Sequence, residues 1–273
     1  MKKILYTIIG ATLALTACEV IPADNQIIEV FTPVDPTSIQ RTSLLIEYSG
    51  WQCVNCPTAA EVAHELKEQY GDNLVVVVMH PESNPNTRHN NKPELNYTCP
   101  EADIVYKHMG GTNTTPFPTG NVNMIMDADS YFSSMDKWAT LISNAYSHAH
   151  PIILGQTVVA NEDTTSINIH VEISNMHTEA KNVNLIVWLT EDGVIGKQKK
   201  PTGTDNEYAH NHLLRASISP TMGDELAIAA QQTAQKQYEY TLPEKVVGSN
   251  CSIVTLVVID GEVVQATETK IGE

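Results

Sequence analysis

The stretch LLIEYSGWQCVNCPTAAEVAHELKEQYGDNLVVVVMHP, residues 44–81, decides the fold of the first half of this chain. An apolar run over 42–50 predicts a short strand. Apolar residues then recur at helical spacing over 57–71, and a second apolar run over 73–81 predicts a buried strand. Strand, helix and strand in one short segment predict a βαβ unit, which requires a parallel sheet and a right-handed crossover.

Two cysteines, Cys53 and Cys56, lie where the first predicted strand meets the helix. A thiol at the start of a helix faces unpaired backbone amides and the positive end of the helix dipole, which favour its thiolate. Pro57 suits this position because amides of the first turn lack helical partners. The pattern indicates a redox centre in which Cys53 attacks a client and Cys56 resolves the mixed disulfide.

A metal site is the alternative for this cysteine pair. It requires two further ligands at suitable spacing, and the sequence holds no second Cys-x-x-Cys pair. The histidines near the pair in sequence would reach it only through tertiary folding, so no metal is expected. No phosphate-binding glycine loop or Ser-His-Asp pattern stands out either, and no cofactor is expected.

The amino terminus reads MKKILYTIIGATLALTAC, residues 1–18. Two lysines, a short apolar run and small residues predict a signal peptide over residues 1–17. The Leu-Thr-Ala-Cys ending resembles the lipobox of bacterial lipoproteins, which implies that Cys18 is lipidated and anchors the chain to a membrane. Residues 18–40, with three prolines and little periodicity, are expected to be a tether.

The charge balance excludes one class of partner. The chain has 16 Lys and Arg against 32 Asp and Glu, and removing residues 1–17 takes away two lysines and no acid. Such an acidic surface repels phosphate backbones, and no basic stripe with interleaved aromatic residues offsets it. Nucleic acid is therefore not expected as a partner.

Two cysteines remain, Cys99 and Cys251. In an exported protein an even number of cysteines favours pairing, so a disulfide between these two is expected to fasten the two halves of the chain. The alternative is a pair of independent buried thiols, which behave as small apolar residues.

The fold class expected is α/β plus all-β. Residues 41–150 are expected to form the α/β domain, with further helices over 101–108 and 131–149 and a strand over 122–126. From residue 152 onward the sequence runs through successive apolar strands with period-two alternation, which predicts a β-sandwich over 151–273. One segment within it, 225–236, has a helical pattern.

Residues 44–81, with Trp51 beside the cysteine motif, resemble the opening of a thioredoxin-like domain. The segment PFPTG, residues 116–120, resembles the second mark of that fold, a cis-proline facing the cysteines. The resemblance implies that the Phe117-Pro118 bond is cis. It also implies that Trp51, Phe117 and Pro118 bind the extended client chain.

Three segments carry a resemblance to the 28-kDa outer-membrane protein family: CVNCP at 53–57, FPTGNVN at 117–123 and EYAHNHLLRAS at 207–217. That family comprises lipoproteins with a thioredoxin-like region before a β-rich region, which implies a location in the cell envelope, at the outer membrane. Two functions stay open. One is thiol-disulfide exchange with exported proteins. The other is non-catalytic binding of a surface ligand, as an adhesin or receptor component, with a structural cysteine pair.

Overall fold

The computed structural model describes residues 39–90, 92–148 and 150–272. The predicted signal peptide and the proposed lipid-bearing Cys18 lie outside these residues, as does the predicted tether except for Ile39 and Gln40. The first half of the chain contains strands and helices in alternation: β1 (Ser43–Tyr48), α1 (Cys56–Tyr70), β2 (Leu74–Met79), α2 (Pro100–His108), β3 (Thr119–Val122) and α3 (Met135–Tyr146).

The second half is β-rich, as its alternating sequence predicts. Its strands are β4 (Ile152–Ala160), β5 (Ser166–Asn175), β6 (Lys181–Glu191), β7 (Val194–Lys200), β8 (Gly203–His210), β9 (Leu213–Ser217), β10 (Asp224–Ile228), β11 (Thr233–Thr241), β12 (Cys251–Ile259) and β13 (Glu262–Lys270).

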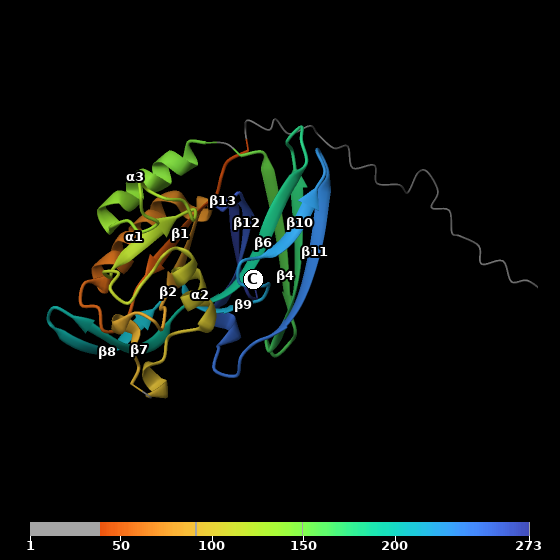
Figure 1. Cartoon of the computed structure of the whole chain (residues 1–273). Helices are drawn as coiled ribbons and strands as arrows, with labels where there is room; N and C mark the ends of the chain where they lie inside the picture. The colour runs from red at the N-terminus through yellow and green to blue at the C-terminus, as the bar shows by residue number, and fades with distance from the viewer. Residues whose placement is uncertain (1–38, 91, 149, 273) are drawn as a thin grey trace, which may run out of the picture. The chain divides into compact units, whose positions relative to one another are not determined.

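One eight-stranded sheet joins the two halves of the chain (Figure 1). Its strand order is β13-β12-β6-β9-β2-β1-β3, with β10 pairing to β6. The predicted parallel βαβ unit is confirmed, because β1 and β2 pair in parallel through all six residues of each strand. β3 pairs antiparallel to β1, and β9 joins β2 through Val78 and Leu213. Strands from both halves therefore share one hydrogen-bonded framework.

The strict alternation of β1 directs its side chains to two different cores. Leu45 packs with the apolar sides of α1 and α3, which cover one face of the sheet through Ala59, Ala63, Trp138 and others. The neighbouring positions Leu44 and Ile46 point to the opposite face. Glu47, two residues after Leu45, consequently lies on the face that α1 covers.

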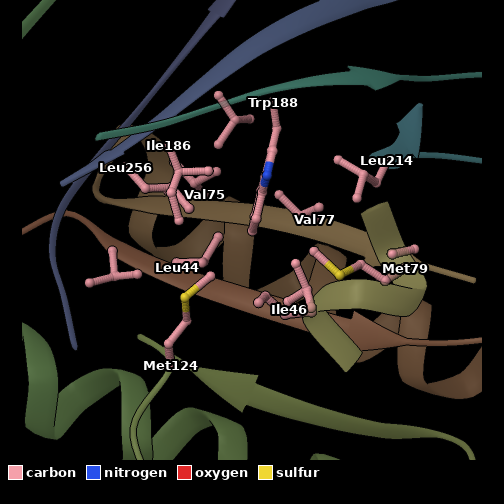
Figure 2. Close-up of a cluster of buried hydrophobic side chains, with 14 of the residues drawn as sticks. Leu44, Ile46, Val75, Val77, Met79, Met124, Ile186, Trp188, Leu214 and Leu256 are labelled. Carbon is pink, nitrogen blue, oxygen red and sulfur yellow. The ribbon is translucent and has the colours of Figure 1, made fainter. Parts of the chain in front are cut away.

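A shared apolar core lies on the other face of β1 and β2. Figure 2 shows the ring of Trp188 on β6 directed toward Val75 and Val77 on β2, with Leu44 and Ile46 nearby. Trp188 is fully buried. Burial of large aromatic surface is a dominant stabilising contribution, so this cluster holds the two halves together without a covalent link.

A third cluster lies between the β-sheets of the second half. The strands β11, β5 and β4 form their own antiparallel sheet, and its inward residues Ile167, Ile169, Val171 and Ile173 pack against Leu185, Val187 and Ile253 of the large sheet. The period-two pattern of residues 166–174 is explained by this one buried face.

Two sequence-based predictions of local structure are wrong. Residues 225–236 span the end of β10 and the start of β11, with a turn between them in which Gln231 has a positive φ of 56°. Their helical spacing is overridden by strand pairing with β6 and β5. The strand predicted over 122–126 ends at Val122, because Asn123 and Met124 turn the chain with φ of 55° and 57°.

The predicted disulfide between Cys99 and Cys251 is also wrong, since both cysteines are free and buried. Cys99 precedes α2 and belongs to the shared core around Trp188, whereas Cys251 begins β12 and belongs to the cluster between the β-sheets. The Cys251 thiol donates to the main-chain oxygen of Val247 at 3.4 Å. The two thiols thus occupy different cores, and the alternative of independent buried thiols holds.

Candidate redox site

Cys53 and Cys56 form a disulfide with their Cα atoms 5.5 Å apart. Cys56 is the first residue of α1, and Pro57 occupies the first turn as predicted. The main-chain amide of Cys53 donates to the oxygen of Gly50 at 3.0 Å, which tightens the loop between β1 and the helix. The two side chains are 4% and 2% exposed, so both sulfurs lie just beneath the surface. Between them in sequence, Val54 and Asn55 are exposed.

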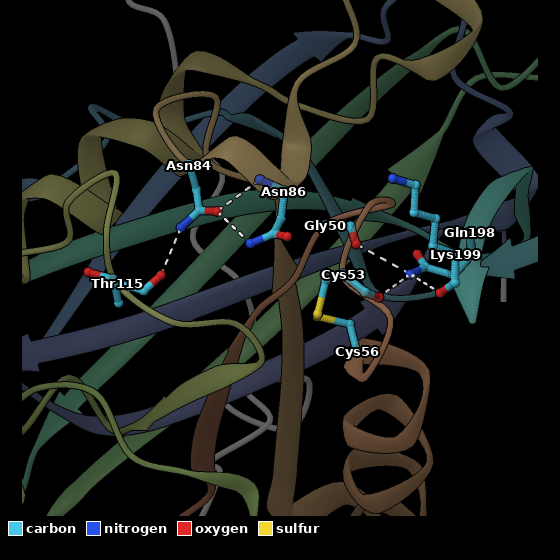
Figure 3. The surroundings of a disulfide bond; sticks show 8 residues. All are labelled: Gly50, Cys53, Cys56, Asn84, Asn86, Thr115, Gln198 and Lys199. Carbon is cyan, nitrogen blue, oxygen red and sulfur yellow. Dashed lines mark hydrogen bonds between the residues drawn. A yellow bond between two sulfur atoms is a disulfide. The ribbon is translucent and has the colours of Figure 1, made fainter. Parts of the chain in front are cut away.

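Two asparagines connect this loop to the segment that precedes β3 (Figure 3). The side chain of the fully buried Asn84 donates to the main-chain oxygen of Thr115 at 3.0 Å and accepts from the amide of Asn86 at 3.0 Å. The oxygen of Asn86 in turn accepts from the amide of Gln52 at 3.0 Å. A methyl group at Gly50 would lie 2.6 Å from that oxygen, which explains the glycine.

The hairpin of β7 and β8 covers the site from the β-rich half of the chain. Gln198 on β7 donates through Nε2 to the main-chain oxygens of Cys53 at 2.8 Å and of Gly50 at 3.3 Å (Figure 3). The amide of Lys199 donates to the oxygen of Trp51 at 2.8 Å. Both strands of this hairpin were absent from the sequence-based assignment. Its polar sequence, KQKK at 197–200, has no apolar alternation to reveal it.

A buried carboxyl group lies near the disulfide. Glu47 on β1 is 1% exposed, and neither of its carboxyl oxygens has a hydrogen-bond partner among the described residues. Burial disfavours the charged form and raises the pKa of Glu47 to about 8. Glu47 and Cys56 line the same small cavity. A lone acid inside an apolar strand is the sequence signal that marks this residue.

Two buried histidines lie beside this carboxyl group. His80 follows β2 and His210 ends β8; they are 2% and 4% exposed, and their ring centroids are 5.6 Å apart. Burial lowers the pKa of His80 well below its usual value, and it lowers the pKa of His210 to about 4. Tyr208, on the same hairpin strand, has its pKa raised to about 12 by burial. These groups are therefore held neutral near pH 7.

The structure places the three residues implied in client binding as follows. Trp51 is 9% exposed and packs in a small apolar cluster with Tyr97 and Leu213, while its Nε1 donates to the main-chain oxygen of Arg88 at 3.1 Å. The Phe117-Pro118 peptide bond is cis, as predicted. Phe117 and Pro118 are half-buried, and the Phe117 ring packs 6.0 Å from that of Tyr106.

Two further polar residues of the segment 207–217, Arg215 and His212, make ion-pair and hydrogen-bond contacts with neighbouring strands and loops. Arg215 pairs with the buried Glu191 at 3.2 Å, and the amide of His212 donates to Asp192 at 2.7 Å. Among the described residues, no group of three or more His, Cys, Asp or Glu side chains is arranged to hold a metal ion.

Comparison with known proteins identifies the family. The model of a family described as outer membrane protein Omp28 matches residues 106–273. The chain belongs to the Omp28 family. Family membership places this protein at the outer membrane, in agreement with the location expected from the sequence. Within the part of the chain that the structure describes, no helix is long and apolar enough to cross a bilayer.

One solved structure shows the same fold at low sequence identity. HBP35 of Porphyromonas gingivalis is 14% identical, with a TM-score of 0.68 over 86% of this chain and 77% of that one. A domain of the outer membrane lipoprotein Omp28 from Porphyromonas gingivalis is 22% identical, with a TM-score of 0.32 over 44% of this chain and 87% of that one. No curated protein matches the sequence of this chain.

Proposed function

We propose that this protein exchanges thiols and disulfides with exported proteins, through Cys53 and Cys56, in a thioredoxin-like domain that spans residues 41–150. The single observation that carries the proposal is the Cys53–Cys56 disulfide at the start of α1, with the buried carboxyl group of Glu47 lining the cavity next to Cys56. The order β1-α1-β2-α2-β3-α3, with β1 between β2 and β3, supports the thioredoxin-like assignment.

The exchange begins from the oxidised pair. A client thiolate attacks Sγ of Cys53, a client-Cys53 disulfide forms, and the Cys53–Cys56 bond breaks with its electron pair on Cys56. Glu47, neutral at pH 7 because of its raised pKa, donates a proton to the leaving Cys56 thiolate. A second client thiolate then attacks the client sulfur and releases Cys53. The client dithiol is oxidised to a disulfide, and the protein disulfide is reduced to two thiols.

The reverse direction uses the same groups. When the reduced protein meets a client disulfide, Cys53 attacks, the carboxylate form of Glu47 takes the proton from Cys56, and Cys56 resolves the mixed disulfide. Cys53 is the sulfur offered to clients because it lies in the loop ahead of the helix beside the exposed Val54. Cys56, which is 2% exposed against 4% for Cys53, lines the same small cavity as Glu47. Phe117 and Pro118, both half-buried, are proposed to line the groove for the client chain.

The anchor is part of the proposal. A lipid on Cys18, followed by the segment up to residue 40, would hold the exchange site at the membrane, with residues 151–273 as a β-sandwich domain fused to it. Acyl chains contribute about 0.8 kcal/mol per buried methylene group, so multiple acylation gives stable attachment.

A second function is favoured by one observation. Cys53 is only 4% exposed, and Gln198 fixes its main-chain oxygen from the β7–β8 hairpin. A protein that binds a surface ligand without catalysis would keep its disulfide covered in this way. The closure of so short a loop removes little entropy from the unfolded chain, however, so stapling alone is a weak reason for the bond.

Thiol trapping in cells separates the two functions. In a Cys56→Ala variant, Cys53 attacks clients but the mixed disulfides are not resolved, so covalent adducts with exported proteins accumulate on non-reducing gels. The matched Cys53→Ala variant lacks the attacking sulfur and forms few adducts. An equal, low level of adducts in both folded variants contradicts the exchange function and supports non-catalytic binding.

A further inference from the structure

A small, partly open cavity lies under the start of α1, between the disulfide and the β7–β8 hairpin. Its volume is about 20 Å³. Polar side chains from four parts of the fold line it. They are Glu47 and Ser49 from β1 and the residues after it, Cys56 from α1, His80 after β2, and Gln198, Tyr208 and His210 from the β7–β8 hairpin. A cavity needs about 10–15 Å³ to hold a water molecule, and the water needs two to four polar partners. This cavity meets both conditions for one water.

Two buried side chains next to the cavity have unmet hydrogen-bonding capacity. Both carboxyl oxygens of Glu47 and both ring nitrogens of His80 lack a partner among the described residues, although the side chains are 1% and 2% exposed. Buried polar groups rarely stay unpaired, because each unpaired group costs about 1–3 kcal/mol. Strand alternation explains why the two side chains lie on the same face of the sheet. Glu47 is two residues after Leu45 and His80 is four residues after Val76, and Leu45 and Val76 both lie on the face that α1 covers.

The β7–β8 hairpin borders the cavity on its outer side. The ring of His210 lies 5.6 Å from that of His80, 4.5 Å from Tyr97 and 4.9 Å from Tyr208, measured between centroids. Nε2 of His210 lies 3.3 Å from the main-chain oxygen of Lys197. A neutral imidazole accepts a proton at one nitrogen and releases one at the other. His80 lines the cavity together with Glu47 and the hairpin residue His210, as a group able to pass a proton.

We infer that one buried water joins Glu47, His80 and Cys56, and that His80 supplies Glu47 with the protons that Cys56 takes up during disulfide reduction. This inference rests on the proposed exchange function. His80 acts through Glu47 and is a positioning and relay residue, since it does not touch the client. When Glu47 has given its proton to the Cys56 thiolate, it is a carboxylate, and a proton entering from the hairpin side through His80 restores the acid.

The pH dependence follows from the groups that face His80. These come from every element packed around it: Glu47 from β1, Cys56 from α1, Tyr97 from the segment before α2, Tyr208 and His210 from β8, and Arg215 from β9. Below pH 8 the carboxyl group of Glu47 already carries a proton, so one reduction of the disulfide does not require the relay. Above pH 8 Glu47 is ionised, and proton delivery through His80 limits the step.

The test is a pH profile of single-turnover reduction, using the full chain in detergent and dithiothreitol as the probe. Rates from pH 6 to 9.5 are corrected for the thiolate fraction of the probe. We expect His80→Asn to slow reduction of the disulfide about tenfold above pH 8 and by less than twofold at pH 6. A tenfold effect is a modest share of what acid-base catalysis contributes. His64→Asn is the matched control, because the His64 side chain is 68% exposed on α1, and its profile should equal that of the wild type.

A merely structural role of His80 would change the rate by the same factor at every pH, and that result, or an unchanged rate above pH 8, overturns the relay. His80→Gln provides a second variant if His80→Asn does not fold. A crystal structure of the wild type gives a separate test: an empty cavity, or a water that does not contact His80, also overturns it. Trapping by Cys56→Ala reports on exchange with clients in cells, so loss of the proposed function and loss of the relay are distinguishable.

Discussion

Gln198 donates a hydrogen bond from Nε2 to the main-chain oxygen of Cys53 at 2.8 Å, across 145 positions of sequence. This contact brings the β-rich half of the chain into the redox loop of the α/β half. Because the same amide group also reaches Gly50, one side chain fixes both ends of the turn that presents Cys53. The β7–β8 hairpin is thus a structural part of the candidate site.

Replacing Gln198 by alanine should loosen the turn around Cys53. The main-chain oxygen of Cys53 loses the Gln198 donor, and that of Gly50 keeps only the amide of Cys53. An unsatisfied buried group costs about 1–3 kcal/mol, so we expect a lower free energy of unfolding and severalfold faster reduction of the disulfide by a phosphine. Gln237→Ala on the exposed edge strand β11 is the control and should change neither quantity. Unaltered reduction kinetics in Gln198→Ala would show that the hairpin does not restrict the disulfide.

Replacing Gly196 by alanine should detach the hairpin in a different way. The added methyl group overlaps the hydroxyl of Tyr97, which accepts a hydrogen bond from the amide of Lys197 at 2.9 Å. Overpacking of this kind costs about 1–3 kcal/mol, which thermal unfolding would detect. In the control Gly155→Ala the nearest atom to the new methyl group is 3.8 Å away, so stability should be retained. Equal melting temperatures for the two variants would contradict the close contact.

Replacing Glu47 by glutamine should change how stability depends on pH. The pKa of Glu47 is about 8 in the folded chain and 4.5 as the ordinary value. The folded state therefore binds the extra proton, and this contribution to stability is complete below pH 4.5 and is lost as the pH rises to 8. Glutamine carries no charge, so at pH 7 the free energy of unfolding of Glu47→Gln should exceed that of the wild type by roughly 3 kcal/mol. At pH 4.5 the two proteins should have similar free energies of unfolding.

Urea unfolding at pH 4.5, 6, 7 and 8 checks this prediction. Glu61→Gln provides the control, because Glu61 is exposed on α1 and its replacement should leave the pH dependence of the wild type intact. A constant difference between Glu47→Gln and the wild type at all four pH values would mean that Glu47 does not titrate on unfolding.

Cys99 and Cys251 should resist alkylation in the folded protein. Burial raises the pKa of each thiol to about 12, so almost no thiolate is present at pH 8, and both side chains are buried in separate cores. Iodoacetamide at pH 8 should label neither cysteine until urea is added, and mass spectrometry of the peptides reads this out. Detection of a Cys99–Cys251 peptide under non-reducing conditions would instead restore the inter-domain disulfide.

Replacing Cys18 by alanine should remove the proposed anchor. Without the thiol no acyl chain is attached, and we expect the chain to leave the membrane fraction as an unprocessed or released form. Labelling with a fatty acid followed by fractionation measures both effects. Full labelling and normal membrane fractionation of Cys18→Ala would rule out the lipid at this position.

The sequence by itself determined the features that depend on neighbouring residues. The βαβ unit follows from apolar runs and helical spacing within 38 residues, and its parallel pairing is confirmed. The cysteine motif at the start of α1 was readable for the same reason, and the cis bond before Pro118 was implied by the resemblance of PFPTG to the proline segment of thioredoxin-like domains. The single buried face of β5 was visible as an alternation of apolar and polar residues. Each of these signals is local, with a fixed period or a fixed motif.

Only the tertiary structure decided which polar residues become buried together. Glu47, His80 and His210 lie on three separate elements, and their burial and pKa values depend on how α1 and the β7–β8 hairpin pack over the sheet. The helical pattern of 225–236 gave way to strand pairing, and Cys99 and Cys251 were assigned to different cores, because long-range packing outweighs local propensity and composition. Desolvation and distance create the candidate site, and neither is encoded in any short stretch of the chain.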